Sequence, residues 1–247
     1  NDDCYYPRMM WSAIPNQLVV VKLNRDQTRM EFFAMDLPNI DKKRIYIEKL
    51  TVWIDLPEEI LFLKDQKRFL FTSEKDGYRH IYFSDYNNKI TQLTTGNWEV
   101  ASIVYIDQKD QKIYYLSNES GIYNRDLYMI SFDGKKKQLL SSGNGWSTAE
   151  FSTTGSYYKL SSSDMNTPPV HAIYDKKGKQ LRVLADNANL KKKMVEYNFS
   201  KKEMISFVTK DNVTLYGWML KPANFNPNEK HPVLIYCYGG PGSQEVM

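Results

Sequence analysis

The chain has 247 residues, enough for one large or two modest domains, and its 42% hydrophobic and 25% charged residues exclude a disordered protein. Its net charge of +4 arises from 33 basic and 29 acidic residues spread along the chain, so the basic face of a nucleic-acid-binding protein is not expected. The two cysteines, Cys4 and Cys237, lie near opposite ends without metal-ligand spacing, which predicts neither a disulfide framework nor a zinc site. No metal or other cofactor is expected.

The N-terminal part of the chain contains four short apolar runs, each about as long as a β-strand or its central part. They lie at residues 9–11, 18–21, 30–33 and 45–47. The whole chain carries 18 Tyr and 11 Phe, and aromatic and β-branched residues fit the pleated, half-buried surface of a sheet better than a helix. Four antiparallel strands are therefore expected in this part.

A clearer version of the same four-strand pattern follows three times, with a period of about 45 residues. The second strand of each copy ends in a serine, at Ser73, Ser117 and Ser161, which are 44 residues apart. The third strands are marked by residues 81–82, 127–128 and 173–174, and the fourth strands by residues 92–93, 138–139 and 182–183. The register is thus kept over three copies.

The turns before the second strands lie at residues 65–67, 110–112 and 154–156, where Asp, Gly and Ser suit tight connections between antiparallel strands. Four-stranded units that repeat every 40 to 45 residues or so are typical of the blades of a β-propeller. A β-sandwich meander is the alternative, but a sandwich needs no fixed period. We therefore predict a mainly β chain with four four-stranded blades, which form a closed ring or half of a larger one.

A change of pattern near Asp186 predicts a domain boundary. A short helix is expected at residues 189–195, and a hairpin of strands 204–209 and 213–220 follows it. The turn of that hairpin is Lys-Asp-Asn, and a polar loop punctuated by prolines comes after the second strand.

The apolar run at residues 233–237 is bounded by a proline and a glycine. Its composition predicts a strand that is buried on both faces, as in the parallel sheet of an α/β enzyme. One such strand cannot form a sheet alone, so this second domain is expected to continue beyond Met247.

Several segments of the chain resemble the prolyl oligopeptidase family. Residues 232–244 carry Pro-Val-Leu and, three residues later, Tyr-Gly-Gly-Pro-Gly-Ser-Gln, behind an array of blades at the distance expected in that family. Residues 72–82, 92–94 and 96–100 are similar to propeller segments of its dipeptidyl peptidase IV branch. The resemblance covers essentially the whole chain.

The resemblance implies an organisation in two domains. In this family an eight-bladed propeller caps an α/β-hydrolase domain and gates the access of substrate to it. Residues 1–185 would accordingly be about four blades of such a propeller, with the other half before Asn1. Residues 186–247 would be the linker and the first strands of the hydrolase domain, and the rest of that domain would belong to the same polypeptide.

The resemblance also implies the activity of the parent enzyme, a serine peptidase that releases N-terminal dipeptides from peptides with Pro or Ala at the second position. It implies a parent that can form a homodimer and that is periplasmic, membrane-anchored or secreted. A tripeptidyl or acylaminoacyl peptidase of the same family is an alternative. Another is a propeller that serves as a binding scaffold beside a degenerate hydrolase domain, and a downstream G-x-S-x-G followed by Asp and His would speak against it.

By resemblance, Tyr238 is the residue that stabilises the oxyanion, its phenol projecting from the strand-to-turn junction toward the scissile carbonyl. The alternative is a structural tyrosine that ends a buried strand and anchors its hydroxyl to the backbone. No G-x-S-x-G nucleophile elbow occurs in the chain. Ser243 is the nearest serine but lacks the two flanking glycines, so the catalytic triad is expected outside this chain and the chain alone is expected to be inactive.

The three histidines are expected to be structural, because His80 and His171 lie in third strands of two blades and His231 opens a strand. Three further polar or aromatic residues are expected to serve blade packing or turn bonding: Arg79, Trp98 and Glu99. No general base for catalysis is therefore predicted in this chain.

Two adjacent glutamates, Glu58 and Glu59, invite comparison with the paired glutamates by which the dipeptidyl peptidase IV branch holds the free amine of its substrate. They lead directly into a first blade strand, whereas the family's pair lies in an earlier insertion that would precede Asn1. The role of amine binding is therefore not assigned to them.

Overall fold

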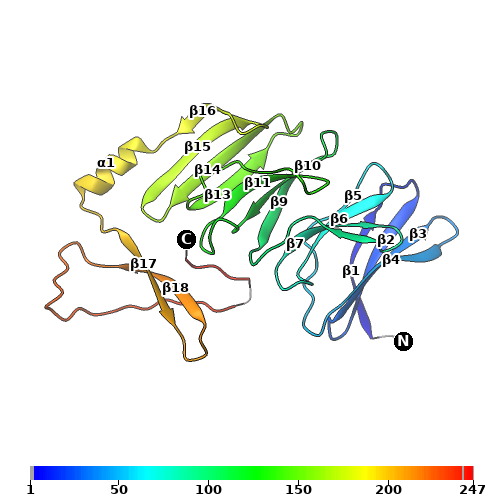
Figure 1. The fold of residues 1–247 in the computed structure, drawn as a ribbon, viewed down its shortest axis with the longest axis horizontal. Helices are drawn as coiled ribbons and strands as arrows, with labels where there is room; N and C mark the ends of the chain where they lie inside the picture. The colour runs from blue at the N-terminus through cyan, green and yellow to red at the C-terminus, as the bar shows by residue number, and fades with distance from the viewer. Residues whose placement is uncertain (1–2, 241, 247) are drawn as a thin grey trace. The chain divides into compact units, whose positions relative to one another are not determined.

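The computed structural model describes residues 3–240 and 242–246, which form mainly antiparallel β-sheet (Figure 1). The chain divides into two compact units, the first made of residues 1–119 and 128–138 and the second of residues 120–127 and 139–247. Among the described residues no helix is long and apolar enough to cross a bilayer.

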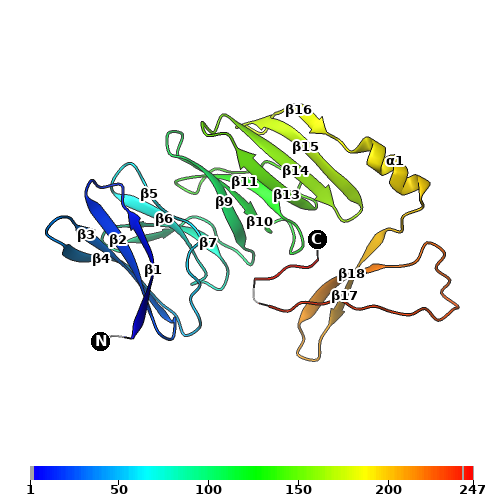
Figure 2. The ribbon, with the colours of Figure 1, turned by 180° about the vertical axis from the view of Figure 1, so that it is seen from behind.

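The first sixteen strands of the described chain form four four-stranded sheets, and in each sheet strands that follow one another in sequence are neighbours (Figures 1 and 2). Sheet 1 contains β1 (Cys4–Trp11), β2 (Gln17–Asn24), β3 (Arg29–Asp36) and β4 (Asp41–Lys49), and sheet 2 contains β5 (Ile60–Phe62), β6 (Arg68–Ser73), β7 (His80–Asp85) and β8 (Ile90–Gln92). Sheet 3 contains β9 (Val100–Asp107), β10 (Lys112–Ser117), β11 (Asp126–Ser131) and β12 (Lys137–Leu139), and sheet 4 contains β13 (Trp146–Phe151), β14 (Tyr157–Asp164), β15 (Thr167–Asp175) and β16 (Gln180–Ala185).

This arrangement confirms the predicted four copies of four strands. The turn before the second strand has the same backbone in sheets 2, 3 and 4, with one left-handed residue in each: Gln66 at φ 57°, Gln111 at φ 51° and Gly155 at φ 67°. In sheet 2 the preceding Asp65 closes the turn, because its carboxylate accepts a hydrogen bond from the amide of Lys67 at 2.9 Å. The aspartate thus bonds the turn, while the residue after it takes the unusual backbone angle.

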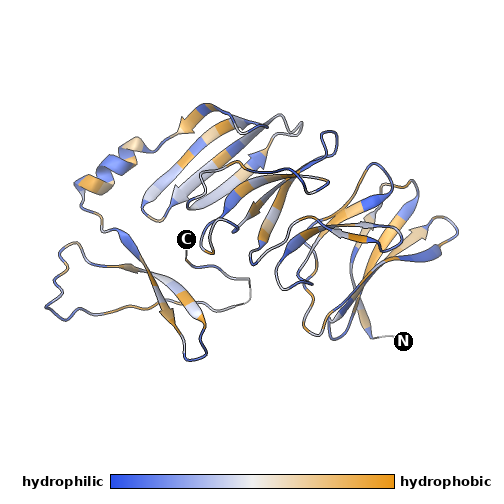
Figure 3. Ribbon diagram, viewed as in Figure 1, coloured by the Kyte–Doolittle hydropathy of each residue, from blue (hydrophilic) through white to orange (hydrophobic). Residues whose placement is uncertain are grey.

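Sheets 1 and 2 pack face to face within the first unit. Their shared core is aromatic: the ring centre of Phe71 lies 4.6 Å from that of Tyr46, and the ring centre of Phe32 lies 5.9 Å from that of Phe69. All four of these side chains are fully buried. Figure 3 shows hydrophobic stretches on the strands and hydrophilic residues in many of the turns, as expected for sheets that bury their faces.

The opposite face of sheet 2 packs against sheet 3. Leu70, Ile81 and Phe83 alternate with the residues that face sheet 1 and form a second core with side chains of β9, β10 and β11. Phe83 contacts Phe132 of the first unit with ring centres 5.0 Å apart. A sheet of a two-layer sandwich has one partner sheet, whereas sheet 2 has a partner on each face. The sheets therefore have the form of β-propeller blades, and the sandwich alternative is wrong.

Sheet 4 lies in the second unit and has two unlike faces. Tyr158, Leu160 and Ala172 are buried on one face. The other face is polar: Lys159 pairs with Glu150 at 2.7 Å, and Ser161 contacts Nδ1 of His171 at 2.6 Å. This alternation follows from the period of two along a strand.

The predicted helix and hairpin are confirmed as α1 (Ala188–Glu196) and the pair β17 (Lys202–Val208) and β18 (Thr214–Leu220). None of the residues of α1 is buried. The turn of the hairpin contains Asn212 in the left-handed region, at φ 65°. Asn166 fixes the start of the hairpin, because its side chain accepts a hydrogen bond from the amide of Lys202 at 2.8 Å and donates one to the carbonyl of the same residue at 3.0 Å.

The prediction of a buried strand at residues 233–237 is wrong for the described chain. The structure contains no regular secondary structure between residue 221 and residue 240, and Leu234 is 96% exposed. A strand of a parallel sheet needs neighbours on both edges and cover on both faces, and β17 and β18, the only strands described after α1, pair with each other. Apolar composition alone therefore does not make this run a strand.

Candidate functional site

Tyr238 lies directly before Gly239 and Gly240, in the extended segment that follows β18. Its side chain is 63% exposed, and its hydroxyl makes no hydrogen bond with any residue that the structure describes. The ring lies over Gly240, where an added Cβ would meet the phenol oxygen at 2.7 Å. Because glycine has no Cβ, the phenol can take this position, and it is not anchored to the backbone in the way that the structural alternative requires.

Ser243 lies in the turn after this tyrosine, and its amide donates a hydrogen bond to the carbonyl of Gly240 at 3.2 Å. His231 is not brought to it. The Nε2 atom of His231 instead contacts the carbonyl oxygen of Asn226 at 3.0 Å, within the loop that precedes the apolar run. The structure therefore shows no serine and histidine pair in this segment.

His80 has the structural role that was predicted for it. Its ring is fully buried at the start of β7, with Nδ1 3.0 Å from the hydroxyl of Thr94 and Nε2 3.0 Å from the carbonyl of Gly96. Trp98 packs against the ring edge to face, with centres 4.8 Å apart. Gly96 has φ +136° and lies so close to Trp98 that a Cβ would clash with the indole, so glycine is required there. These contacts close the end of β8 onto β7.

Glu58 and Glu59 do not act as a pair. The carboxylate of Glu58 lies 3.8 Å from the guanidinium of Arg79, whereas Glu59 makes no interaction among the described residues. Arg79 also binds Glu74, with Nη2 and Oε1 3.0 Å apart. The arginine thus joins the segment before β5 to the turn between β6 and β7, which confirms its role in turn bonding.

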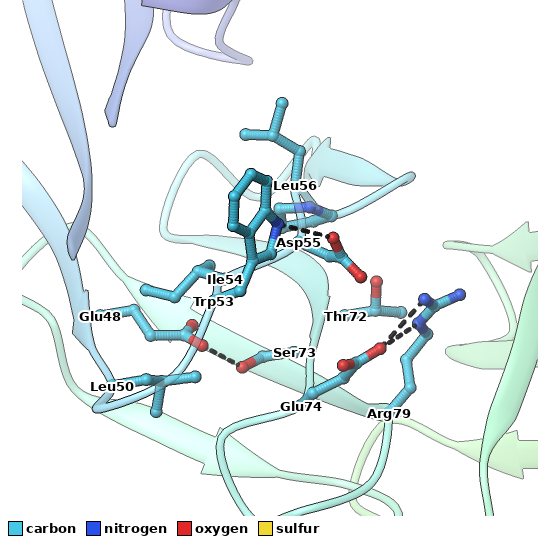
Figure 4. A pocket seen from close by; sticks show the side chains of 11 residues that line it. Glu48, Leu50, Trp53, Ile54, Asp55, Leu56, Thr72, Ser73, Glu74 and Arg79 are labelled. Atoms are coloured by element: carbon cyan, nitrogen blue, oxygen red, sulfur yellow. Dashed lines mark hydrogen bonds and ion pairs between the residues drawn. The ribbon is translucent and has the colours of Figure 1, made fainter. Parts of the chain in front are cut away.

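A pocket that the sequence did not reveal lies beside Arg79 (Figure 4). One wall is the segment 53–57, which is held in place at three points. The side chain of Ile54 is buried in the core of sheets 1 and 2, its amide donates to the carbonyl of Gln27 at 2.7 Å, and Arg8 of β1 donates to the carbonyl of Pro57 at 2.6 Å. Ile54 is buried, whereas its two neighbours, Trp53 and Asp55, are exposed.

The other walls of the pocket come from β4, from the end of β6 and from the turn that follows β6. Glu48 is buried there and accepts hydrogen bonds from the hydroxyl of Ser73, at 2.7 Å, and from the hydroxyl of Tyr46. Asp55 accepts a hydrogen bond from the indole nitrogen of Trp53 at 3.1 Å. Three carboxylates line the pocket, those of Glu48, Asp55 and Glu74, and Arg79 is its one cationic lining residue.

The buried groups next to the pocket have shifted proton affinities. Burial raises the pKa of the Tyr46 phenol above its ordinary value, and the carboxylate of Glu48 raises it further. Burial lowers the pKa of Lys75, although the carboxylates of Glu48 and Asp76 act in the opposite direction. The ammonium of Lys75 lies 3.9 Å from the centre of the Tyr82 ring, so part of its stabilisation comes from aromatic faces.

The sequence and the fold can be compared with known proteins at this point. Residues 1–169 match the family described as dipeptidyl peptidase IV (DPP IV) N-terminal region. The chain belongs to the dipeptidyl peptidase IV branch of the prolyl oligopeptidase family. This membership confirms the resemblance that residues 72–82 and 238–244 carry, and it agrees with the blades that the structure shows.

Relatives of this branch match nearly the whole chain. It is 33% identical to a probable dipeptidyl peptidase 4 of Arthroderma benhamiae, over 99% of this chain and 33% of that protein. It is 29% identical to a probable dipeptidyl-aminopeptidase B of Emericella nidulans, over 100% of this chain and 29% of that protein. The chain thus spans about a third of the length of the curated relatives it matches.

The crystal structure of Porphyromonas gingivalis dipeptidyl peptidase 4 superimposes with a TM-score of 0.88 at 30% identity, and the match covers 100% of this chain and 35% of that one. A putative dipeptidyl aminopeptidase IV from Bacteroides ovatus has a TM-score of 0.83 at 23% identity, which supports the fold alone. Fold and family therefore agree for the whole described chain.

Proposed function

We propose that this chain is part of a serine exopeptidase that releases N-terminal dipeptides from peptides with Pro or Ala at the second position. The observation that carries the proposal is the match of 100% of the chain to a dipeptidyl peptidase 4 structure at a TM-score of 0.88. Residues 1–185 are proposed to belong to the propeller, which gates access to the active site. Residues 186–247 are proposed to begin the peptidase domain.

In this proposal Tyr238 donates its phenol hydrogen to the carbonyl oxygen of the scissile bond as negative charge develops there. Two features of the structure support the assignment. The phenol is exposed and its hydroxyl is not engaged by any described residue. Gly240 has no Cβ, so the phenol can lie over it at the strand-to-turn junction. A donor that acts only on the developing oxyanion contributes to the transition state and little to the binding of the substrate.

The serine, aspartate and histidine of the catalytic triad are proposed to lie in the polypeptide outside this chain, because no G-x-S-x-G sequence occurs in it. The chain by itself is then inactive. Hydrolysis of a Gly-Pro chromogenic substrate by the purified chain alone would contradict this, whereas the whole protein is expected to hydrolyse the same substrate.

The test of Tyr238 is its replacement by Phe in the whole protein, with Tyr236→Phe as the matched control. Tyr236 is equally a tyrosine of the exposed segment, two residues earlier. Tyr238→Phe is expected to lower kcat about 100-fold or more with little change in KM, because one oxyanion donor contributes about 3 kcal/mol. An unchanged kcat would remove the assignment. A whole protein inactive toward every dipeptide and tripeptide substrate would instead favour the scaffold alternative.

A further inference from the structure

The pocket beside Arg79 carries an excess of negative charge that the surrounding residues leave unbalanced. Arg79 is already engaged, because Glu74 binds it at 3.0 Å and Glu58 lies 3.8 Å away. Lys75 interacts electrostatically with Glu48. Asp55 has no cationic partner among the residues that the structure describes, and its one hydrogen bond comes from the indole of Trp53.

A second, independent feature is the hydroxyl of a buried threonine that faces the same space. Thr72 is 7% exposed, and its hydroxyl makes no hydrogen bond with any described residue. Figure 4 shows this hydroxyl pointing into the pocket, between the carboxylate of Asp55 and the guanidinium of Arg79. Because this oxygen has no partner among the described residues, it is available to accept a hydrogen bond from a group in the pocket.

We propose that this pocket binds the side chain of a lysine or arginine residue in a peptide. The ammonium or guanidinium would donate hydrogen bonds to Asp55 and to the hydroxyl of Thr72, and the aliphatic part would lie along Trp53. The inference rests on the proposed function only in taking a peptide as the ligand.

The shape and chemistry of the pocket fit this ligand class better than an anion or a small apolar group. The enclosed part of the pocket measures about 20 Å³, which is room for one water-sized group such as an ammonium, so the aliphatic stem of the side chain would lie outside it along Trp53. Trp53 is 62% exposed, so its indole is available to the stem and to the charge of a basic side chain. An anion would meet three carboxylates and an arginine that is already paired.

The probes are peptides of the sequence Ala-Pro-Ala-Ala-Ala in which lysine, arginine, norleucine or glutamate replaces each alanine in turn. The bond after proline is N-methylated to prevent hydrolysis. Norleucine has the length of lysine without its charge, so the ratio of the two dissociation constants isolates the cation. Binding is measured by calorimetry on the whole protein at about 50 mM and about 500 mM salt.

At one position of the peptide, lysine or arginine is expected to bind about fivefold more tightly than norleucine, since a partly exposed ion pair contributes about that much. The ratio should fall at the higher salt concentration. Asp55→Asn should abolish it while keeping the shape of the side chain, and Thr72→Val should reduce it about twofold. Glu59→Gln removes the same charge from a neighbouring residue outside the pocket and should leave it unchanged.

Equal affinity of the lysine and norleucine peptides at every position would overturn the inference, and so would a preference that persists in Asp55→Asn. Hydrolysis of unmethylated Ala-Pro peptides is measured in parallel, so that failure of the basic subsite can be distinguished from failure of the peptidase assignment. Normal hydrolysis without a lysine preference removes the basic subsite alone. A lysine preference in a protein that hydrolyses none of the peptides supports the subsite and removes the peptidase assignment.

Discussion

The contact between sheets 1 and 2 and the contact between sheets 2 and 3 are built on the same repeat but with different buried chemistry. Three pairs of equivalent residues, each 44 positions apart, show this difference. They are Phe71 and Tyr115, Ser73 and Ser117, and Lys75 and Glu119. In the first contact Ser73 donates to the buried carboxylate of Glu48, and the ammonium of Lys75 lies against the Tyr82 ring.

In the second contact the equivalent polar groups are less engaged. The hydroxyls of Tyr115 and Ser117 are buried without a hydrogen-bond partner among the described residues, and Glu119 pairs with the half-exposed Lys137. Aromatic rings meet in this contact as well, with the centre of Phe83 of sheet 2 5.0 Å from that of Phe132. Tyr115 stacks on Tyr128 within sheet 3, with centres 5.8 Å apart. The comparison teaches that the blade repeat specifies the backbone and the apolar faces, while each contact has its own polar network.

The largest expected effect is that of removing an aromatic ring from the first contact. The ring of Phe71 lies within 6.4 Å of four others, and the side chain is fully buried. Phe71→Ala should lower the free energy of unfolding by about 4 kcal/mol through lost burial and a cavity. Phe132, in the second contact, has one such neighbour, Phe83, and its replacement by Ala should cost about 3 kcal/mol.

Urea denaturation of both variants measures the difference. If Phe132→Ala were the more harmful change, the second contact would be the stronger one, contrary to the pattern of ring contacts. A change in the slope of the denaturation curve as well as its midpoint would indicate that the two contacts unfold separately.

A smaller effect is expected from removing the carboxylates that distinguish the two contacts. Glu48→Ala leaves the hydroxyls of Tyr46 and Ser73 without their acceptor and removes one of the two carboxylates that stabilise the charge of Lys75, so it should cost about 3 kcal/mol. Glu119→Ala is the control and should cost at most about 1 kcal/mol, because its partner Lys137 is partly exposed.

Thermal or chemical unfolding of these two variants decides whether the buried network of the first contact matters. Equal losses would show that Glu48 contributes no more than a surface ion pair. Adding Lys75→Met to Glu48→Ala should recover part of the loss, since the ammonium is then no longer buried without a counter-charge.

The dependence of stability on alkaline pH involves both contacts. Burial raises the pKa of Tyr46, and Glu48 adds to the rise; burial also raises the pKa of Tyr115, and Glu119 adds to it. In the unfolded chain tyrosine titrates near pH 10, so the folded protein holds these protons more strongly. Their contribution is complete below about pH 10 and is lost as the pH rises toward the folded values.

The free energy of unfolding should therefore fall above about pH 10 by about 1.4 kcal/mol per pH unit for each tyrosine. Urea titrations between about pH 9 and pH 11 measure this slope, which Tyr46→Phe should reduce by one tyrosine's share. A slope that is the same in this variant and in the wild-type protein would mean that Tyr46 titrates normally in the folded state.

The blades could be predicted from the sequence because their signal is local and repeated. Apolar runs of strand length recur at fixed distances, and each turn before a second strand has suitable residues, such as Asp65. The structural role of His80 followed from its position in a third strand. These features require no knowledge of distant contacts.

The pocket could not be predicted, because its walls come from three places in the chain. Glu48 ends one sheet, Asp55 lies in a connection, and Thr72 belongs to the next sheet; only the packing of sheets 1 and 2 brings them together. The alternation of Trp53 and Asp55 about an apolar residue was the one local signal available. The prediction of a strand at residues 233–237 failed because an apolar run forms a strand only beside partner strands, and no local sequence pattern reports whether these are present.

The smallest expected effect is that of Tyr115→Phe, and it tests the comparison most directly. The change removes a buried hydroxyl that has no partner among the described residues and keeps the ring that stacks on Tyr128. The free energy of unfolding at neutral pH should stay the same or rise by up to about 1 kcal/mol, because an unpaired polar group is costly to bury. Tyr46→Phe, the matched change in the first contact, should lower it by about 1 to 2 kcal/mol, since it takes a donor from Glu48. A loss in Tyr115→Phe as large as that in Tyr46→Phe would show that the second contact holds a hydrogen-bonded network equal to the first.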